Sequence, residues 1–401
     1  MAIGDLVEER KSLISKSKLY EELKIKADLS IDGVNIEKEA LHALDVGGEI
    51  QEQVHSGFEM DKETHVGIEL PASFRLPNGL VSPFKWDKSS NYTIALENGK
   101  FILVKKGNKL FEVDFQKRPK YYSLKTSDGQ PMHNIATFVN DSNISAFYSN
   151  ECSYKDKGED CLFCNVNATK DTYAEKEVIF WKTPIQIGET VAAAYEEGIA
   201  DHVTVTGGII PERREIEYYL DVAEEIQKRT GLKDFNGTAV IAAPLDLSNI
   251  DRLKEAGYRT IGLNIELWDK NFYQTICPGK ARNSGGWDHW LKSIEYAAGV
   301  FGHGRVRSNI VGGIEPKEKT LKGVEYFSSI GVICLPSQWC ANPGSALEGH
   351  RTPEPSWHLD LAEKVVRLQK KAGITYDQAH DASNNDTGLS HDIWKIEDGL
   401  I

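Results

Sequence analysis

Three of the six cysteines lie close together in one polar stretch of the sequence. Cys152, Cys161 and Cys164 fall within "ECSYKDKGEDCLFCNVN", with eight residues in the first gap and two in the second. Cysteine is among the most buried residue types, so three thiols in a polar loop indicate a role in binding or catalysis. The intervening residues are polar and include Gly158, so the loop can bring the three thiolates to one centre.

Thiolates bind soft metal centres, and three interpretations of this segment stay open. Iron–sulfur ligation suits thiolates, and a [4Fe–4S] cluster held by three cysteines leaves one iron free for a substrate or cofactor. Zinc with an unidentified fourth ligand is the second interpretation, although structural zinc sites favour paired Cys-x-x-Cys motifs or a late pair of histidines. Three unrelated free thiols are the third.

The overall composition narrows the class of protein and its partners. The 401 residues are 40% hydrophobic and 27% charged, which predicts a soluble globular protein. The net charge of −13 opposes binding to nucleic acid. The sequence lacks a long apolar run and a secretory leader, so we expect a cytoplasmic protein with no membrane partner. In that reducing compartment a disulfide framework is not expected.

Alternating strand and helix patterns after about residue 140 predict an α/β fold. The predicted strands are residues 144–148, 202–206, 238–242, 260–265, 306–311 and 332–335, and a helical pattern follows each of the six. Crossovers of this length imply a parallel sheet, closed or partly closed into a (βα)6 barrel. A doubly wound open sheet is the alternative.

Changes in these patterns along the sequence predict three regions. Residues 1–140 form a smaller α+β domain, with helix over 1–30 and a β-meander in "NYTIALENGKFILVKKGNKLFEVDF". Residues 141–373 form the barrel, and residues 374–401 form a tail that closes or flanks it. Parallel α/β folds work at the carboxyl ends of their strands. The cysteine segment, "TGG" at 206–208, "NIE" at 264–266 and "NIVGGIE" at 309–315 are all expected there.

In this order the four segments resemble the motifs of the radical S-adenosylmethionine superfamily, in its biotin-synthase-like branch. The ending Cys161, Leu162, Phe163, Cys164 resembles the superfamily's Cys-x-aromatic-Cys, although the first gap is longer than the commonest pattern. The resemblance implies that Cys152, Cys161 and Cys164 hold a [4Fe–4S] cluster and that Phe163 lies beside the cofactor.

The glycine-containing segment after the second strand resembles the motif whose backbone receives the methionine amino group of S-adenosylmethionine. Thr206, Gly207 and Gly208 match it, with Ile209 where the family often has Glu. A side chain at either glycine would block the approach of the backbone to a ligand.

The remaining motifs imply the other contacts of S-adenosylmethionine. Asn264 and Glu266 resemble the pair that holds the ribose hydroxyls, and alternate positions of one strand point to one face. Arg282 stands where that branch often places an arginine for the methionine carboxylate. "SNIVGGIE" resembles the motif that contributes adenosine-side positions, which are here Ile310, Gly312 and Glu315.

The resemblance implies an enzyme that cleaves S-adenosylmethionine by one-electron reduction and starts radical chemistry on a small molecule, in cofactor or metabolite biosynthesis. It also implies anaerobic chemistry and an electron donor such as ferredoxin or flavodoxin, and it is compatible with a homodimer. The reaction type stays open. The expected substrate residues lie after the sixth strand or in the tail: Gln338, Trp339, Cys340, Tyr376 and His380.

Two other functions are weighed against this one. The first is a barrel stabilised by zinc or an iron–sulfur cluster, with a binding or scaffold role. The second is an aldolase-like barrel without a metal, but its Schiff-base lysine is not evident, because "WDKN" and "CPGKAR" place their lysines in loops.

Overall fold

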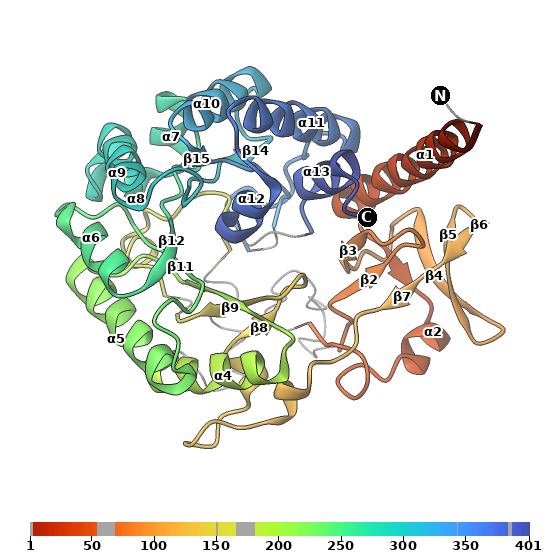
Figure 1. The fold of residues 1–401 in the computed structure, drawn as a ribbon, viewed down its shortest axis with the longest axis horizontal. Coiled ribbons are helices and arrows are strands. Elements are labelled where there is room, and N and C mark those ends of the chain that lie inside the picture. The colour runs from red at the N-terminus through yellow and green to blue at the C-terminus, as the bar shows by residue number, and fades with distance from the viewer. Residues whose placement is uncertain (1–2, 54–68, 150, 166–180, 343, 384–386) are drawn as a thin grey trace.

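The computed structural model describes residues 3–53, 69–149, 151–165, 181–342, 344–383 and 387–401. Its main sheet has seven strands in the spatial order β15-β13-β12-β11-β10-β9-β8. Figure 1 shows these strands inside an arc of helices. The strands of this sheet are β8 (Thr137–Phe138), β9 (Asn143–Phe147), β10 (His202–Thr206), β11 (Gly237–Val240), β12 (Tyr258–Gly262), β13 (Val306–Arg307) and β15 (Val332–Ile333).

The six strands from β9 to β15 are parallel, and each pairs with its neighbour along the chain. Spatial order and chain order therefore agree, so every crossover runs in the same direction, as in a barrel. A doubly wound sheet reverses its strand order, and that alternative is wrong. The predicted partial parallel barrel is confirmed, with β8 antiparallel to β9 at one edge. The helices of the arc are α4 (Pro184–Glu197), α5 (Glu212–Thr230), α6 (Ser248–Glu255), α9 (Gly286–Phe301), α10 (Lys317–Ser329) and α11 (Pro355–Lys371).

Local sequence explains where these elements begin and end. The strands are buried on both faces, because helices and the barrel interior cover a parallel sheet: in β10, His202 and Thr204 are buried like Val203 and Val205. Helix α4 begins with a capping box between Thr183 and Gln186 and ends at Gly198, which has a left-handed backbone.

Two predicted strands are interrupted at their carboxyl ends. The strand expected over 306–311 is divided into β13 and β14 (Val311–Gly312), and β14 pairs with β16 (Ser337–Gln338) in a separate two-stranded sheet. The strand expected over 260–265 ends at Gly262, and Glu266 then bridges to Ile310. These short strand pairings thus extend the barrel at the carboxyl ends of its strands.

The region before the barrel contains one long helix and two small sheets. The predicted meander is confirmed as β4 (Tyr92–Glu97), β5 (Lys100–Lys105) and β6 (Asn108–Glu112), which are antiparallel. Strand β1 (Asn35–Ile36) joins them, and β2 (Ser73–Arg75), β3 (Val81–Pro83) and β7 (Asp114–Phe115) form the other sheet. Strand β8 joins the barrel sheet before the boundary predicted at residue 140, and that boundary stays a prediction.

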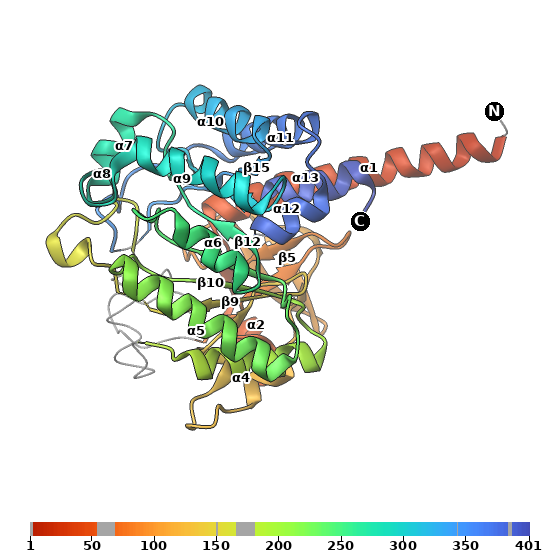
Figure 2. The ribbon, with the colours of Figure 1, turned by 60° about the vertical axis from the view of Figure 1, so that its left-hand side comes forward.

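Helix α1 (Ile3–Asp32) projects away from the barrel at its amino end, as Figure 2 shows. Its carboxyl-terminal half packs on α11 and on α13 (Leu389–Asp398), where Lys26 forms a buried ion pair with Asp392. The shorter helices are α2 (Lys38–Ala43), α7 (Lys270–Ile276), α8 (Pro278–Asn283) and α12 (Tyr376–Ser383). Among the helices of the described residues, none has the length and apolar character needed to cross a lipid bilayer.

Candidate active site

The cysteine segment is a loop that follows β9 and is fixed at both ends by backbone hydrogen bonds. Ser153 N donates to Ile209 O at 2.7 Å, which ties the start of the loop to the residues after β10. Leu162 N donates to Ile276 O at 2.9 Å, which ties its second half to the corner between α7 and α8. The loop therefore lies across the carboxyl ends of the strands.

The three thiols share this loop without forming a ligand set in this conformation. The Cys161 thiol is hydrogen-bonded to that of Cys277, and this bond together with burial raises the pKa of Cys161 well above its usual value. Cys277 is fully buried. Over the described ranges, no three His, Cys, Asp or Glu side chains are grouped so that they could hold a metal ion. Cys152 and Cys164 must approach Cys161 to share one centre.

The two glycines after β10 are required by the packing of the cysteine loop. A Cβ on Gly208 would lie 1.9 Å from Glu151 O, and one on Gly207 would lie 2.5 Å from the Tyr148 ring. Tyr148 Oη also donates to Gly208 O at 2.9 Å. The close approach in the structure is to the preceding strand and loop, and an approach of this backbone to a ligand stays a prediction.

A cavity of about 670 Å³ lies between the carboxyl end of the barrel and the N-terminal region. Six of the predicted site residues line it: Phe163, Asn264, Glu266, Gln338, Trp339 and Cys340. They come from the cysteine loop and from the segments after β12 and β15. The structure therefore brings together one side chain of the predicted cluster loop, the predicted ribose pair and three of the predicted substrate residues.

Glu266 is positioned by an unusual backbone and a buried cation. Its φ is +70°, which is strained for a residue with a side chain, so strand alternation does not place it beside Asn264 as predicted. Lys280 Nζ donates to Glu266 Oε1 at 2.6 Å and to Asn264 O at 2.9 Å. Burial would lower the pKa of Lys280, but Glu266 and the neighbouring thiols hold it above its usual value.

Arg282 does not line the cavity, and its predicted position is corrected. Its side chain is 65% exposed and its Nη1 lies 2.6 Å from Glu159 Oε1, on the cysteine loop. Lys280, two residues earlier, is the buried cation beside the cavity, and sequence reasoning had assigned it to a loop. Residues two apart lie on different sides of a helix, so α8 presents Lys280 to the site and Arg282 to solvent.

Four further predicted cofactor positions lie outside the cavity lining: Thr206, Ile310, Gly312 and Glu315. Glu315 is buried and accepts hydrogen bonds from Trp268 N at 3.1 Å and Asp269 N at 2.8 Å. It thereby fixes the loop that follows Glu266. A Cβ on Gly312 would lie 3.0 Å from Leu361 Cδ2, so this glycine serves the packing of α11.

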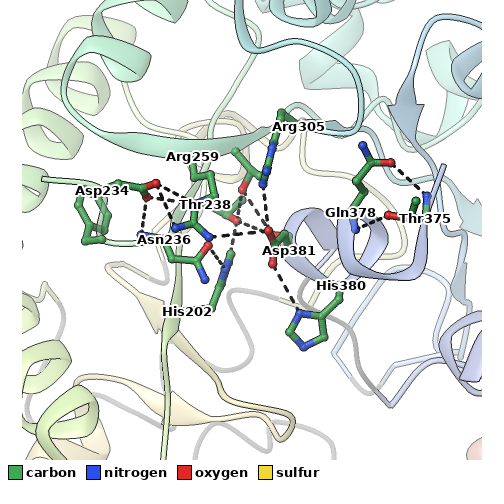
Figure 3. Close-up of polar contacts among 12 residues, drawn as sticks. His202, Asp234, Asn236, Thr238, Arg259, Arg305, Thr375, Gln378, His380 and Asp381 are labelled. Carbon is green, nitrogen blue, oxygen red and sulfur yellow. Dashed lines mark hydrogen bonds and ion pairs between the residues drawn. The ribbon is translucent and has the colours of Figure 1, made fainter. Parts of the chain in front are cut away.

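Tyr376 and His380 lie on α12, at the opposite end of the barrel, and their prediction as substrate residues is corrected. His380 Nε2 is hydrogen-bonded to Asp141 O, which precedes β9, at 3.0 Å. Figure 3 shows the neighbouring Asp381 facing Arg305, with an Oδ2–Nη1 distance of 2.9 Å. Arg305 immediately precedes β13, so α12 covers the amino ends of the strands.

Sequence reasoning also missed two buried charged groups. Arg307 ends β13 inside the barrel, where Gly262 leaves room for it, because a Cβ there would lie 2.9 Å from Arg307 Nε. Burial lowers the pKa of Arg307 to about 10. Glu215, on α5, is buried with its carboxylate 3.3 Å from Ala242 N, and burial raises its pKa to about 8. Glu215, the second glutamate of "PERRE", could not be recognised as buried from the sequence, because its position in the pattern also suits the exposed surface of a helix.

Part of this chain is similar to known proteins. Residues 149–325 match the family model of the Radical SAM superfamily. A curated protein, bacteriochlorophyllide c C-7(1)-hydroxylase from Chlorobaculum limnaeum, is 27% identical over 272 residues, which cover 64% of this chain. The chain spans 66% of the length of that relative, slightly less than two thirds.

Solved structures with similarity to this chain include methylornithine synthase (PylB), with a TM-score of 0.44 and 18% identity over 61% of this chain and 68% of that one. The FeFe-hydrogenase maturase HydG from Carboxydothermus hydrogenoformans has a TM-score of 0.43 and 15% identity over 59% of this chain and 55% of that one. The matched residues 149–325 begin just before the cysteine loop and extend into α10. Residues 149–325 form a radical SAM domain, and members of that superfamily use a [4Fe–4S] cluster and S-adenosylmethionine.

Proposed function

We propose that this chain is a radical SAM enzyme of the biotin-synthase-like branch, which transforms a small molecule in cofactor or metabolite biosynthesis. One observation carries the proposal. Phe163, Asn264, Glu266, Gln338 and Cys340 come from separate segments after the barrel strands, and they line one cavity. A cavity of about 670 Å³ is within the range of small-molecule sites.

The residues present fit the cluster in their chemistry. Cys152, Cys161 and Cys164 are free thiols on one anchored loop, and three thiolates suit iron–sulfur ligation. When bound, the cluster and S-adenosylmethionine supply a one-electron reduction that yields a 5′-deoxyadenosyl radical. The Cys277 thiol beside Cys161 has no assigned part in ligation.

The protein groups around the cavity position and shield the reactants. The Lys280 ammonium, 2.6 Å from Glu266 Oε1, fixes the position of that carboxylate, whose oxygens can accept hydrogen bonds from ribose hydroxyls. Asn264 offers an amide next to it. The N-terminal region covers the cavity, which supports the exclusion of water from a reactive radical.

The partners of the reaction are part of the proposal. The reduction needs an electron donor such as ferredoxin or flavodoxin, and we expect the protein to work in the cytoplasm under anaerobic conditions, as a monomer or homodimer. The net charge of −13 supports small molecules rather than nucleic acid as partners.

A tetrapyrrole is a second candidate substrate. The name of the C. limnaeum relative says that it hydroxylates bacteriochlorophyllide c at C-7(1), and the 27% identity supports a test of that pigment. Incubation of the reduced enzyme with bacteriochlorophyllide c and S-adenosylmethionine, followed by mass spectrometry, would give a product heavier by one oxygen. An unchanged pigment under conditions that yield 5′-deoxyadenosine excludes this substrate.

The proposed function is tested by anaerobic reconstitution with iron and sulfide. We expect about four irons and four sulfides per chain, and 5′-deoxyadenosine after addition of dithionite and S-adenosylmethionine. Cys152→Ala, Cys161→Ala and Cys164→Ala should each lose both, whereas Cys334→Ala, a buried thiol away from the loop, should retain both. One zinc per chain without sulfide would instead support the zinc-stabilised scaffold.

A further inference from the structure

We propose that Lys85, in the N-terminal region, binds a carboxylate of the substrate, so that the substrate class is a small organic acid. The inference rests on the proposed function, because it takes the cavity of about 670 Å³ as the substrate site. Nothing in the barrel motifs points to this residue, which lies after β3 and lines the wall of the cavity opposite the strand ends.

Lys85 is fixed at this wall by the end of α1. Its Nζ donates to Ile31 O at 2.6 Å and to Cys340 Sγ at 3.7 Å. The Cys340 thiol donates in turn to Ser30 O at 3.7 Å. Both carbonyls belong to the last turn of α1, where the helix dipole favours a cation. The ammonium group is thereby held beside a predicted substrate residue.

No protein carboxylate contacts the Lys85 ammonium in the part of the chain that the structure describes. Asp32, which ends α1, attracts it at longer range. Glu266 is the acidic residue among those that line the cavity, and it is paired with Lys280. A lysine ammonium that faces a partly enclosed cavity without a contacting counter-ion favours an anionic ligand, and a carboxylate can supply the missing contact.

Both walls of the cavity also present buried polar atoms that lack a hydrogen-bond partner among the described residues. Three belong to residues before 140, Gln53 Oε1, Ser73 Oγ and Thr137 Oγ1, and three belong to the barrel segments, Asn309 Oδ1, Gln338 Nε2 and Trp339 Nε1. Ser73 is 3% exposed and Thr137 is 9% exposed.

Buried polar atoms are nearly always hydrogen-bonded, so unpartnered atoms on both walls indicate groups that a ligand supplies. The set contains both donors and acceptors, which fits a molecule with hydroxyl or amide groups in addition to its carboxylate. Such a molecule would place its carboxylate at the N-terminal wall and extend toward the wall formed by Asn264 and Glu266.

The test compares carboxylates with their amides on the reconstituted, full-length enzyme in the presence of S-adenosylmethionine. The probes are glutarate, adipate and 3-phenylpropanoate, each with the matched neutral amide, and binding is measured by isothermal titration calorimetry. We expect at least one acid to bind about tenfold more tightly than its amide, a difference typical of one charge-assisted contact. If no acid binds more tightly than its amide, the proposal is wrong.

Two variants at Lys85 separate charge recognition from structural support. Lys85→Met should remove the preference for the acid, and Lys85→Arg should retain most of it. Lys100→Met, which removes a lysine 60% exposed on β5, should leave it unchanged. If Lys85→Met weakens the binding of the acid and of the amide equally, the role of Lys85 is only to support α1, and the proposal is wrong.

The outcome is independent of the test of the proposed function. Formation of 5′-deoxyadenosine by the wild-type protein is measured in the same preparations. A preparation that binds acids through Lys85 but yields no deoxyadenosine supports the anion site and contradicts the enzyme proposal. A preparation that forms 5′-deoxyadenosine but shows no preference for acids through Lys85 contradicts the anion site alone.

Discussion

The two ends of the barrel both carry buried polar side chains, but they satisfy them differently. At the amino end the groups bond to one another. His202 Nδ1 lies 3.1 Å from Asn236 Oδ1, and its Nε2 lies 2.9 Å from Thr238 Oγ1. Figure 3 shows these contacts continuing to Asp381 and Arg305. Burial lowers the pKa of His202 to about 4, so the ring is neutral near pH 7.

At the carboxyl end, Gln53 Oε1 and Gln338 Nε2 are buried on opposite walls of the cavity, and neither has a partner within the described part of the chain. A polar network whose members all bond to one another contributes to a unique fold. Hydrogen-bond donors and acceptors left without partners around a cavity instead indicate a ligand. The comparison shows that burial of polar residues does not by itself identify a site, whereas unpartnered polar atoms gathered around one cavity do.

Acidic groups at the two ends shift in opposite directions. Burial alone would raise the pKa of Asp381, but His380, His202 and Arg305 together hold it below its usual value. Glu215, beside the carboxyl end of the barrel, has no ion-pair partner among the described residues, and burial raises its pKa to about 8. Substitutions at each end therefore test whether the two ends of the barrel differ in this way.

The largest effect is expected for Gly208→Ala. The new Cβ would lie 1.9 Å from Glu151 O, so the cysteine loop must move. A misplacement of about 1 Å can cost about 100-fold in rate, and we expect a loss of this size in 5′-deoxyadenosine formation, with reduced iron content. Gly299→Ala is the matched control, because a Cβ there meets open space on α9. Full iron content and activity in Gly208→Ala would contradict a close contact between loop and strand.

A pH-dependent effect on stability is expected for Glu215→Gln. The folded chain keeps a proton on Glu215 up to about pH 8, whereas the unfolded chain releases it near pH 4.5. The unfolded state thus binds fewer protons in this window, so the contribution of Glu215 to stability falls as pH rises through it.

Urea unfolding at pH 5, 6.5 and 8 provides the measurement. The free energy of unfolding of Glu215→Gln relative to wild type should increase with pH, by up to a few kcal/mol. Contributions from other groups, such as His202, cancel in this difference. A difference that does not change with pH would mean that Glu215 is ionised in the folded protein.

The smallest effect is expected at the amino end of the barrel, for Asp381→Asn. The substitution removes the ion pair with Arg305, which is partly exposed, and should lower the free energy of unfolding by about 1 kcal/mol. Formation of 5′-deoxyadenosine should not change, because α12 lies away from the cavity. Asp377→Asn, at an exposed position of the same helix, is the control. A large loss of activity with normal stability would place this end of the barrel in the reaction.

Sequence periodicity predicted the regular parts of the barrel well, because both faces of its strands are buried. The strand predicted over 202–206 coincides with β10, and the helical patterns "TPIQIGETVAAAYEEG" and "EIEYYLDVAEEIQKRTG" fall on α4 and α5, although α5 begins three residues earlier, at Glu212. It failed where the chain leaves regular geometry. The left-handed backbone of Glu266 and the separate pairing of β14 with β16 have no signature in apolar spacing.

The candidate site was predicted in part, since motif order located the segments but not the direction of every side chain. Asn264 and Glu266 reached the cavity, whereas Arg282 points to solvent and Glu315 fixes a loop. His380 was misplaced because chain order does not tell to which end of the barrel a tail returns. Lys85 was missed because the N-terminal region has no counterpart in the barrel motifs.

The buried pair between Lys26 and Asp392 bears on the way this cavity is completed during synthesis. Ser30 and Ile31, whose carbonyls hold Cys340 and Lys85, follow Lys26 on the same helix. That helix is synthesised before the barrel, whereas its buried partner on α13 is synthesised after the barrel. The wall that carries Lys85 is therefore completed only once α13 has been made, and a nascent barrel remains open on that side until then.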